Sequence, residues 1–143
     1  MRHICRLCNH EMSFFSTTRQ RDYYRCSNCD SIQLDQNMLL DHNSEKYRYE
    51  LHNNDIDDPG YQKFVKPITS FVLDNFNSKD KGLDFGAGPG PVISKVLNDH
   101  GYNISQYDPY FHPNDQLLQE KYHYVIACEV IEHFNKPKTS FDI

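Results

Sequence analysis

The chain has 143 residues, about the length of one ordinary domain, and 38% of them are hydrophobic, which excludes a wholly disordered chain. Fifteen basic against twenty acidic residues give a net charge of −5, so the chain as a whole has no basic field for nucleic acid. No apolar stretch approaches the roughly 20 residues of a membrane span, and the first residues carry no signal region for secretion. Five cysteines in such a chain predict a cytoplasmic location and bound metal rather than disulfides.

Composition divides the chain into three zones. Residues 1–34 contain four of the five cysteines, residues 35–60 are polar, and residues 61–143 alternate helical and strand-like patterns. We predict a small zinc ribbon over 1–34, a linker or a lid over a cofactor at 35–60, and a partial α/β domain over 61–143. The candidate lid side chains are Tyr47, Tyr49, His52, Asn53 and Asn54.

The four N-terminal cysteines have the spacing of a zinc site. Cys5 and Cys8 form one Cys-x2-Cys pair, and Cys26 and Cys29 form a second, with 17 residues between the pairs. Each pair can aim two sulfur atoms at one ion, and two pairs complete a tetrahedron with no open position. We therefore expect a structural Zn²⁺, which would supply folding free energy that so short a zone cannot draw from a hydrophobic core.

Aromatic and arginine side chains are frequent in the same zone. They could bind RNA by stacking, or the aromatic rings could cover the small core of the ribbon. With four thiolates and one zinc ion included, residues 1–30 carry a net charge of about zero, which favours the second interpretation. The side chains concerned are Phe14, Phe15, Arg19, Arg21, Tyr23, Tyr24 and Arg25.

Apolar spacing predicts the elements of the third zone in chain order. Residues 62–77 have helical spacing, with Pro59-Gly60 as the helix entry and Pro67 expected to kink the helix. Residues 82–85 form a short strand, and residues 92–100 form an amphipathic helix that ends at Gly101. Residues 102–107 and 122–128 form two more strands, and the last is apolar enough for burial on both faces. This order predicts an α/β domain with a parallel sheet.

A glycine-rich turn follows the first of these strands, over residues 84–90. Alternating glycines let the backbone turn sharply and approach a ligand closely. The spacing differs from the dinucleotide fingerprint, and the Lys-Ser/Thr of a phosphate loop is absent. Asp108 comes 20 residues after Gly88, at the end of the next strand, where a carboxylate can accept both hydroxyls of a ribose. The turn and the carboxylate together predict an adenosine-bearing ligand.

These motifs resemble those of the class I S-adenosylmethionine-dependent methyltransferases. The resemblance rests on residues 83–90, 106–108 and 122–133, in family order. It implies a Rossmann-like parallel sheet over 61–143, with S-adenosyl-L-methionine as the cofactor. It implies that Asp84 holds the ammonium end, that Asp108 holds the ribose, and that Pro109 and Tyr110 flank the adenine. The implied contacts of the methionine part are Gly86, Ala87 and Gly88, with Gly90 and Glu129 also at the cofactor.

Glu129, Glu132 and His133 are the candidate catalytic residues. On a helix, Glu129 and Glu132 would share one face with His133 beside them. The run resembles that of the ubiquinone-biosynthesis O-methyltransferases and the small-RNA 2′-O-methyltransferases, where the matching residues hold a divalent ion that would lower the pKa of an acceptor hydroxyl. The same run also occurs in family members without metal, with the histidine at the substrate, so both roles stay open.

The predicted function is methyl transfer to a small-molecule acceptor, at a hydroxyl or a sugar carbon. Residues 31–143 contain 10 basic and 17 acidic residues, which disfavours the alternative of RNA methylation with the ribbon as the RNA contact. The chain ends soon after the third strand, which would leave an exposed apolar sheet edge. We therefore also expect a C-terminally incomplete domain or a dimer that covers the edge, and a non-catalytic cofactor-binding or zinc scaffold is a further alternative.

Overall fold

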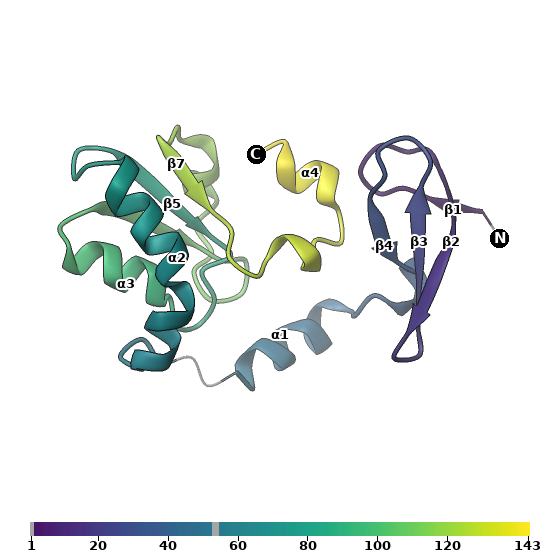
Figure 1. Cartoon of the computed structure of the whole chain (residues 1–143), viewed down its shortest axis with the longest axis horizontal. Coiled ribbons are helices and arrows are strands. Elements are labelled where there is room, and N and C mark those ends of the chain that lie inside the picture. The colour runs from purple at the N-terminus through teal and green to yellow at the C-terminus, as the bar shows by residue number, and fades with distance from the viewer. Residues whose placement is uncertain (1, 53–54) are drawn as a thin grey trace. The chain divides into compact units, whose positions relative to one another are not determined.

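The computed structural model describes residues 2–52 and 55–143, and the chain divides into two units (Figure 1). The ribbon unit comprises Met1–His42 together with His133–Ile143, and the α/β unit comprises Asn43–Glu132. The last eleven residues therefore belong with the cysteine zone, which no composition pattern indicated. Among the helices of the described residues, none has the length and apolarity that crossing a bilayer requires.

The ribbon unit is built on a four-stranded antiparallel sheet. Its strands are β1 (His3–Ile4), β2 (Glu11–Thr18), β3 (Arg21–Cys26) and β4 (Ile32–Leu34), paired in that order. Arg19 and Gln20 both have left-handed backbone angles, with φ of 50° and 62°, which suits the two-residue turn between β2 and β3. The short helices η1 (Gln36–Met38) and α4 (Pro137–Phe141) complete this unit.

The core of the ribbon is small and consists of the buried Cys5, Met12 and Cys26 with partly buried neighbours that include Tyr24. Phe14 and Phe15 are 59% and 48% exposed. Neither residue belongs to the buried core, but the Phe14 ring lies edge-on to Tyr24 at 5.9 Å between ring centroids, and Tyr24 packs against the core.

The α/β unit has a three-stranded parallel sheet in the order β6-β5-β7. This confirms the prediction of a parallel α/β arrangement. Its elements, in chain order, are α1 (His42–Glu50, which begins at the unit boundary), α2 (Pro59–Asn75), β5 (Lys81–Phe85), α3 (Val92–Asp99), β6 (Asn103–Tyr107), η2 (Asp115–Gln119), β7 (Tyr124–Ile126) and η3 (Ile131–His133).

The sequence indicates where both long helices begin and where α3 ends, whereas α2 ends at Asn75, two residues before the predicted end. The Asp58 side chain accepts a hydrogen bond from Gly60 N at 2.8 Å, and Pro59 occupies the first turn of α2, a position that needs no backbone donor. The helix continues through Pro67 as one element. After α3, Gly101 has a φ of 78°, as expected for a glycine that ends a helix.

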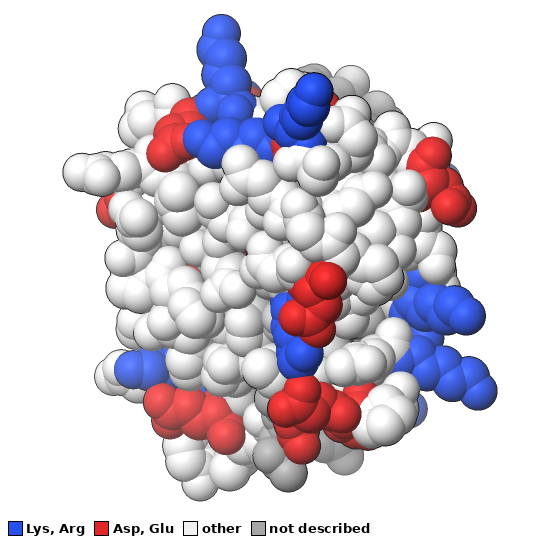
Figure 2. Space-filling view, turned by 90° about the vertical axis from the view of Figure 1, so that its left-hand side faces the viewer, with Lys and Arg blue, Asp and Glu red and all other residues white. Residues whose placement is uncertain are grey.

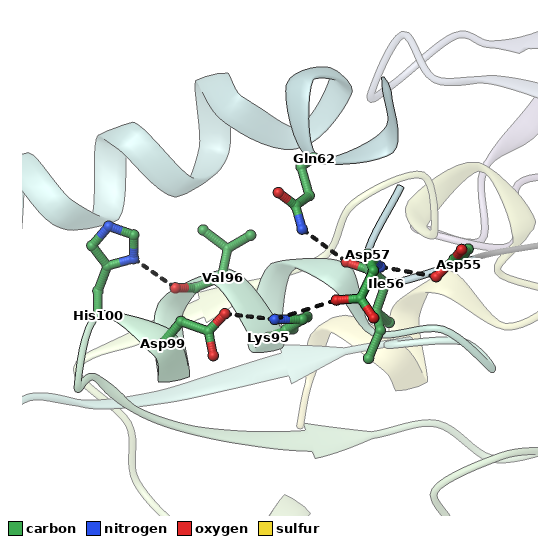
Figure 3. Close-up of polar contacts among 8 residues, drawn as sticks. All are labelled: Asp55, Ile56, Asp57, Gln62, Lys95, Val96, Asp99 and His100. Carbon is green, nitrogen blue, oxygen red and sulfur yellow. Dashed lines mark hydrogen bonds and ion pairs between the residues drawn. The ribbon is translucent and has the colours of Figure 1, made fainter. Parts of the chain in front are cut away.

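The segment before α2 is tied to α3 by polar contacts (Figure 3). The Lys95 ammonium lies 2.6 Å from Asp99 and 3.5 Å from Asp57. Gln62 Nε2 also donates to the carbonyl of Ile56 at 2.9 Å. These contacts hold the entry to α2 beside α3, and residues of both helices pack in one core against the sheet.

The hydrophobic core lies between these helices and one face of the sheet (Figure 1). Its buried members are Val65, Val72, Val92, Ile93, Leu97, Ile104, Tyr124 and Ile126. Side chains alternate between the faces of a strand, so Val125, between Tyr124 and Ile126, points away from the helices and is 58% exposed. The prediction that 122–128 is a strand buried on both faces is wrong, since β7 has three residues and α2 and α3 cover only one face.

Residues 42–50 form α1, although the zone 35–60 reads as a linker or a lid. Its sequence lacks the apolar periodicity by which amphipathic helices are recognised, and in the structure none of its residues is buried. Within it, Lys46 Nζ lies 3.9 Å from Glu50 one turn later. Such a pair stabilises a helix by only about 0.3 kcal/mol.

Leu97→Ala should lower the free energy of unfolding of the α/β unit by about 2–5 kcal/mol, because it leaves a cavity in a close-packed core. Leu97 is fully buried against α2 and the sheet. Urea unfolding followed by circular dichroism measures the change. The adjacent exposed Asn98, changed to alanine, is the control and should shift stability by less than about 0.5 kcal/mol. Equal effects of the two substitutions would contradict the assigned core.

Candidate functional site

The glycine turn between β5 and α3 is shaped by two left-handed glycines. Gly86 and Gly88 have φ of 74° and 70°, and the amides of Gly86 and Ala87 both donate to the carbonyl of Tyr107, at 2.8 and 3.0 Å. A Cβ on Gly86 would lie 2.6 Å from the Val130 side chain, whereas a Cβ on Gly88 would meet nothing within 4 Å. Gly86 is therefore needed for packing, and Gly88 presents bare backbone to open space.

Asp108 lies against this turn, as its sequence position predicted. Its side chain is buried, and Oδ2 accepts a hydrogen bond from Gly88 N at 2.9 Å. Oδ1 accepts from Tyr110 N at 2.8 Å and from Phe111 N at 3.2 Å. A carboxylate has about four acceptor positions, so Asp108 holds the turn and keeps capacity for a further donor. Pro109, which follows it, is exposed, and Gly90 is buried at the other end of the turn.

Asp84 is the second buried carboxylate of the site. It is 4% exposed, and Oδ2 accepts a hydrogen bond from Ser94 Oγ at 2.8 Å. Burial raises the pKa of Asp84 to about 6, against the opposing effects of the Ser94 hydrogen bond and the charge of His112. At neutral pH this carboxylate is therefore mostly ionised inside a poorly solvated site, where it favours a cationic partner.

His112 belongs to the site, and sequence reasoning missed it. Its backbone pairs with Asp108 through two hydrogen bonds of 3.1 and 3.0 Å. Its Nε2 is buried and has no hydrogen-bond partner among the described residues, which is uncommon for a buried polar atom. A lone histidine in a loop carries no motif, so the only available signal was its distance of four residues from Asp108.

Side chains at the ends of β5 and β7 influence one another electrostatically. Burial, followed by the charges of Glu129 and Asp84, raises the pKa of the Cys128 thiol. Burial also raises the pKa of Tyr61, with Cys128, Asp84 and Glu129 as the further causes. Glu129 is exposed and has a left-handed φ of 54°, a conformation that is uncommon for a residue other than glycine.

The expectation that Glu129 and Glu132 share a helix face with His133 is wrong in its geometry. Glu129 lies in a turn, and η3 begins only at Ile131. The left-handed backbone at Glu129 breaks the helical path between the two glutamates. Within the described residues, the four N-terminal cysteines are the one group whose ligand atoms cluster closely enough for a metal ion. The catalytic and metal-binding roles of Glu129, Glu132 and His133 stay predictions.

Helix α1 contacts the loop that follows Asp108. The Tyr110 hydroxyl donates to Glu45 Oε2 at 2.6 Å, and the rings of Tyr49 and Tyr110 lie 6.1 Å apart. Burial and then the Glu45 interactions raise the pKa of both tyrosines, so both hydroxyls stay protonated donors. Among the predicted lid residues, Tyr47 is 61% exposed, and Asn53 and Asn54 lie outside the described residues. Glu45 was not predicted.

The four cysteines of the ribbon unit come together as the spacing predicted. All four Sγ atoms lie within 4.8 Å of one another, with Cys5 and Cys29 at 3.7 Å and Cys8 and Cys26 at 3.4 Å. None forms a disulfide. This arrangement is compatible with a zinc ribbon and suggests that the chain binds metal.

The two cysteine pairs sit in equivalent turns. Cys5 N donates to His10 O at 2.8 Å, and Cys26 N donates to Ser31 O at 2.9 Å. Asn9 and Asp30, each directly after the second cysteine of its pair, have φ of 61° and 58°. Each turn thus curls its backbone around the sulfur cluster. Side-chain donors also reach the sulfur atoms, such as Gln33 Nε2 at 3.2 Å from Cys5 Sγ.

A family model described as a methyltransferase domain matches residues 59–142, which is more than half of the chain. The chain belongs to this methyltransferase family. No curated protein and no solved structure matches it. The matched residues contain the glycine turn, Asp84, Asp108 and Glu129, whereas the candidate lid residues precede the matched range.

Asp84→Asn should stabilise the domain more at pH 8 than at pH 5. Burial raises the Asp84 pKa from 3.8 to about 6. Ionisation of Asp84 therefore lowers the free energy of unfolding, by about 3 kcal/mol once the pH is well above the folded-state pKa. The cost is absent below pH 3.8 and grows as the pH rises through this interval. Urea unfolding at both pH values measures it, with the exposed Asp74→Asn as the control. A difference between wild type and Asp84→Asn that does not change with pH would contradict this origin.

Proposed function

We propose that this protein is an S-adenosylmethionine-dependent methyltransferase with a Rossmann-like domain, acting on a small-molecule acceptor, and that its ribbon holds a structural Zn²⁺. The observation that carries the proposal is the pairing of Gly88 and Asp108. The glycine leaves open space where a side chain would stand, and the buried carboxylate is held against it by a hydrogen bond of 2.9 Å.

The residues around the turn fit this cofactor chemically. A buried carboxylate with capacity for a further donor can accept a ribose hydroxyl, and His112 Nε2 lacks a partner among the described residues. The site is also acidic, since Asp84 and Glu129 accompany Asp108, and residues 43–132 contain 8 basic and 14 acidic residues. Such a field favours a ligand that carries a sulfonium and an ammonium group.

Each residue has a distinct task in this proposal. Asp84, ionised at neutral pH, would bind the ammonium group, and Asp108 would bind the ribose. Pro109 and Tyr110 would lie beside the adenine. Glu45 and Tyr49 support the position of Tyr110 through the 2.6 Å hydrogen bond and the ring contact, which gives α1 a role as a lid. When bound, the cofactor supplies a methyl group already activated for transfer, so the chain mainly needs to align the acceptor and exclude water.

Glu129, Glu132 and His133 are proposed to act on the acceptor. A hydroxyl acceptor needs a base or a divalent ion to lower its pKa, and carboxylates and an imidazole can serve in either role. Glu132→Gln would then lower kcat without changing the dissociation constant of the cofactor. If chelation of divalent ions leaves kcat unchanged while zinc stays bound, the residues act without metal.

A small-molecule acceptor is favoured over RNA by the distribution of charge. On the face drawn in Figure 2, basic and acidic side chains stand in small groups of mixed sign, separated by wide uncharged areas. RNA binding depends on neutralising consecutive phosphates, and this face offers no continuous basic surface. The exposed Phe14 and Phe15 support the RNA alternative, and a steep salt dependence of RNA binding would favour it.

Gly88→Ala should weaken S-adenosylmethionine binding at least tenfold, because its methyl group would fill the space through which the backbone meets the ligand. Isothermal titration calorimetry measures the dissociation constant. Gly101→Ala is a matched control, since Gly101 also has a positive φ, 78°, and open space around its Cβ. Both substitutions carry a similar backbone cost of about 1–2 kcal/mol, but Gly101→Ala should bind the cofactor within about twofold of wild type. Equal binding by both variants would refute the proposed cofactor site.

The proposed Zn²⁺ should be present at one ion per chain and should be lost in Cys26→Ser. The Cys26 side chain is fully buried in the sulfur cluster, and a zinc site of this type stabilises its fold outright. Metal analysis of the purified protein and its thermal unfolding measure the two effects. Cys128→Ser is the control, because Cys128 lies outside the cluster. Full zinc content in Cys26→Ser would contradict the assignment.

A further inference from the structure

The ribbon unit contains a pocket of about 540 Å³ that brings the two ends of the chain together. Arg6 and Asn9, from the first cysteine turn, line it together with residues of the C-terminal segment around α4. The Arg6 guanidinium fastens this segment, because Nη1 donates to the carbonyls of Phe134 and Asn135 at 3.2 and 3.4 Å. The pocket is therefore built into the unit by specific contacts.

The lining of the pocket is cationic. It includes Arg6, Lys136 and Lys138 and no aspartate or glutamate. Among the described residues, no carboxylate lies within ion-pair distance of Arg6 or Lys136. Lys138 pairs with Asp142 at 3.1 Å, but both side chains are more than half exposed, and such a pair is weak and readily exchanged.

Arg6 donates its hydrogen bonds to neutral acceptors. Burial lowers the pKa of Arg6, and the charge of the neighbouring Cys5 thiolate also acts on it, raising this pKa by less. Besides the two carbonyls, Nε donates to Gln33 Oε1 at 3.3 Å, and Nη2 takes part in none of the hydrogen bonds formed among the described residues. A half-buried arginine is usually paired with an anion. Its planar group is held in a fixed orientation by these hydrogen bonds, and Nη2 keeps its N–H groups for an oxygen of a phosphate.

The three cations match an anion with more than one negative charge. A carboxylate would neutralise one of them, whereas a phosphate or diphosphate would neutralise two or three at neutral pH. Amide groups of Asn9, Gln36 and Asn135 and the hydroxyl of Thr139 also line the pocket. These groups can bind the hydroxyls or ester oxygens next to a phosphate. A volume of about 540 Å³ suits a small molecule.

The rest of the ribbon unit argues against a long nucleic acid as the ligand. Outside the pocket it contains four arginines and six acidic residues. Two of these arginines, Arg2 and Arg25, already face Glu11 and Asp30. No basic track therefore leads away from the pocket along which consecutive phosphates of RNA could lie.

We propose that the pocket lined by Arg6, Lys136 and Lys138 binds the phosphate or diphosphate group of a small phosphorylated molecule. This inference goes beyond methyl transfer and stands independently of it. A chain that failed to bind S-adenosylmethionine would still bind the phosphate group, and cofactor binding measured on the same samples separates the two conclusions.

The test uses the full chain with its zinc content measured, and uridine diphosphate as the probe, since this molecule carries a diphosphate but no adenosine. Isothermal titration calorimetry compares wild type with Lys136→Gln/Lys138→Gln and with the control Lys63→Gln/Lys66→Gln. The control removes the same charge from exposed positions on α2. Both lysines of the test pair are exposed, so the variant is expected to fold and to keep its metal.

We expect wild type and the control to bind the probe equally, the test variant to bind at least tenfold more weakly, and inorganic phosphate to compete. Uridine without phosphate should not bind. The inference is overturned if wild type shows no binding at about 10 mM probe, a concentration that would detect even a weak phosphate contact, or if both variants lose affinity equally. It is also overturned if a single-stranded RNA of about 20 nucleotides binds far more tightly with a steep salt dependence.

Discussion

The hydrogen bond from Gly88 N to the Asp108 carboxylate is the constraint on which the α/β site depends. Parallel pairing places Phe85 opposite Tyr107, so the turns that follow β5 and β6 leave the sheet side by side. The hydrogen bond of 2.9 Å joins these two turns. The Tyr107 carbonyl also accepts hydrogen bonds from two further amides of the glycine turn. The shape of the turn is thus established by the protein alone, which is the condition for binding a ligand without a large ordering cost.

Much of this arrangement could be predicted from the sequence because it follows from local rules. Apolar residues at helical spacing gave α2 and α3, and the glycine turn with Asp108 followed from the length of one strand-turn-helix-strand unit. The cysteine cluster was predictable for a similar reason, since two residues between ligands leave few ways to form a turn. The decisive residues of the glycine turn and of the cysteine cluster belong to motifs with a fixed spacing, so their contacts could be expected although they lie about 20 residues apart.

His112 was missed although it lies four residues from Asp108, whereas the other missed features depend on contacts between distant residues. Glu45 and Tyr110 are 65 positions apart, and although Tyr110 was expected at the adenine, nothing in the sequence indicated that Glu45 would contact it. Helix α1 is polar throughout, so its contact with the loop after Asp108 left no trace in the hydrophobic periodicity. The one-sided burial of β7 was missed for a related reason. An apolar run shows that a strand can be buried, but which of its faces is covered depends on where the helices pack.

The two units differ in net charge. Residues 43–132 contain 8 basic and 14 acidic residues, whereas the ribbon unit contains 7 basic and 6 acidic ones. The acidic excess includes buried carboxylates at the end of the parallel sheet. One of them is Asp84, whose pKa is raised by burial. A buried acid that costs stability is retained most readily where its charge has a use, and a cationic ligand at the glycine turn would provide one.

The backbone conformation of Glu129 also costs stability. A left-handed conformation at a residue other than glycine costs about 1–2 kcal/mol, and glycine would remove this cost. Glutamate stands there with φ of 54° and an exposed side chain, close enough for its charge to act on Cys128 and Tyr61. The turn after β7 therefore keeps a carboxylate at a position where the backbone conformation alone would favour glycine, which supports the role proposed for Glu129.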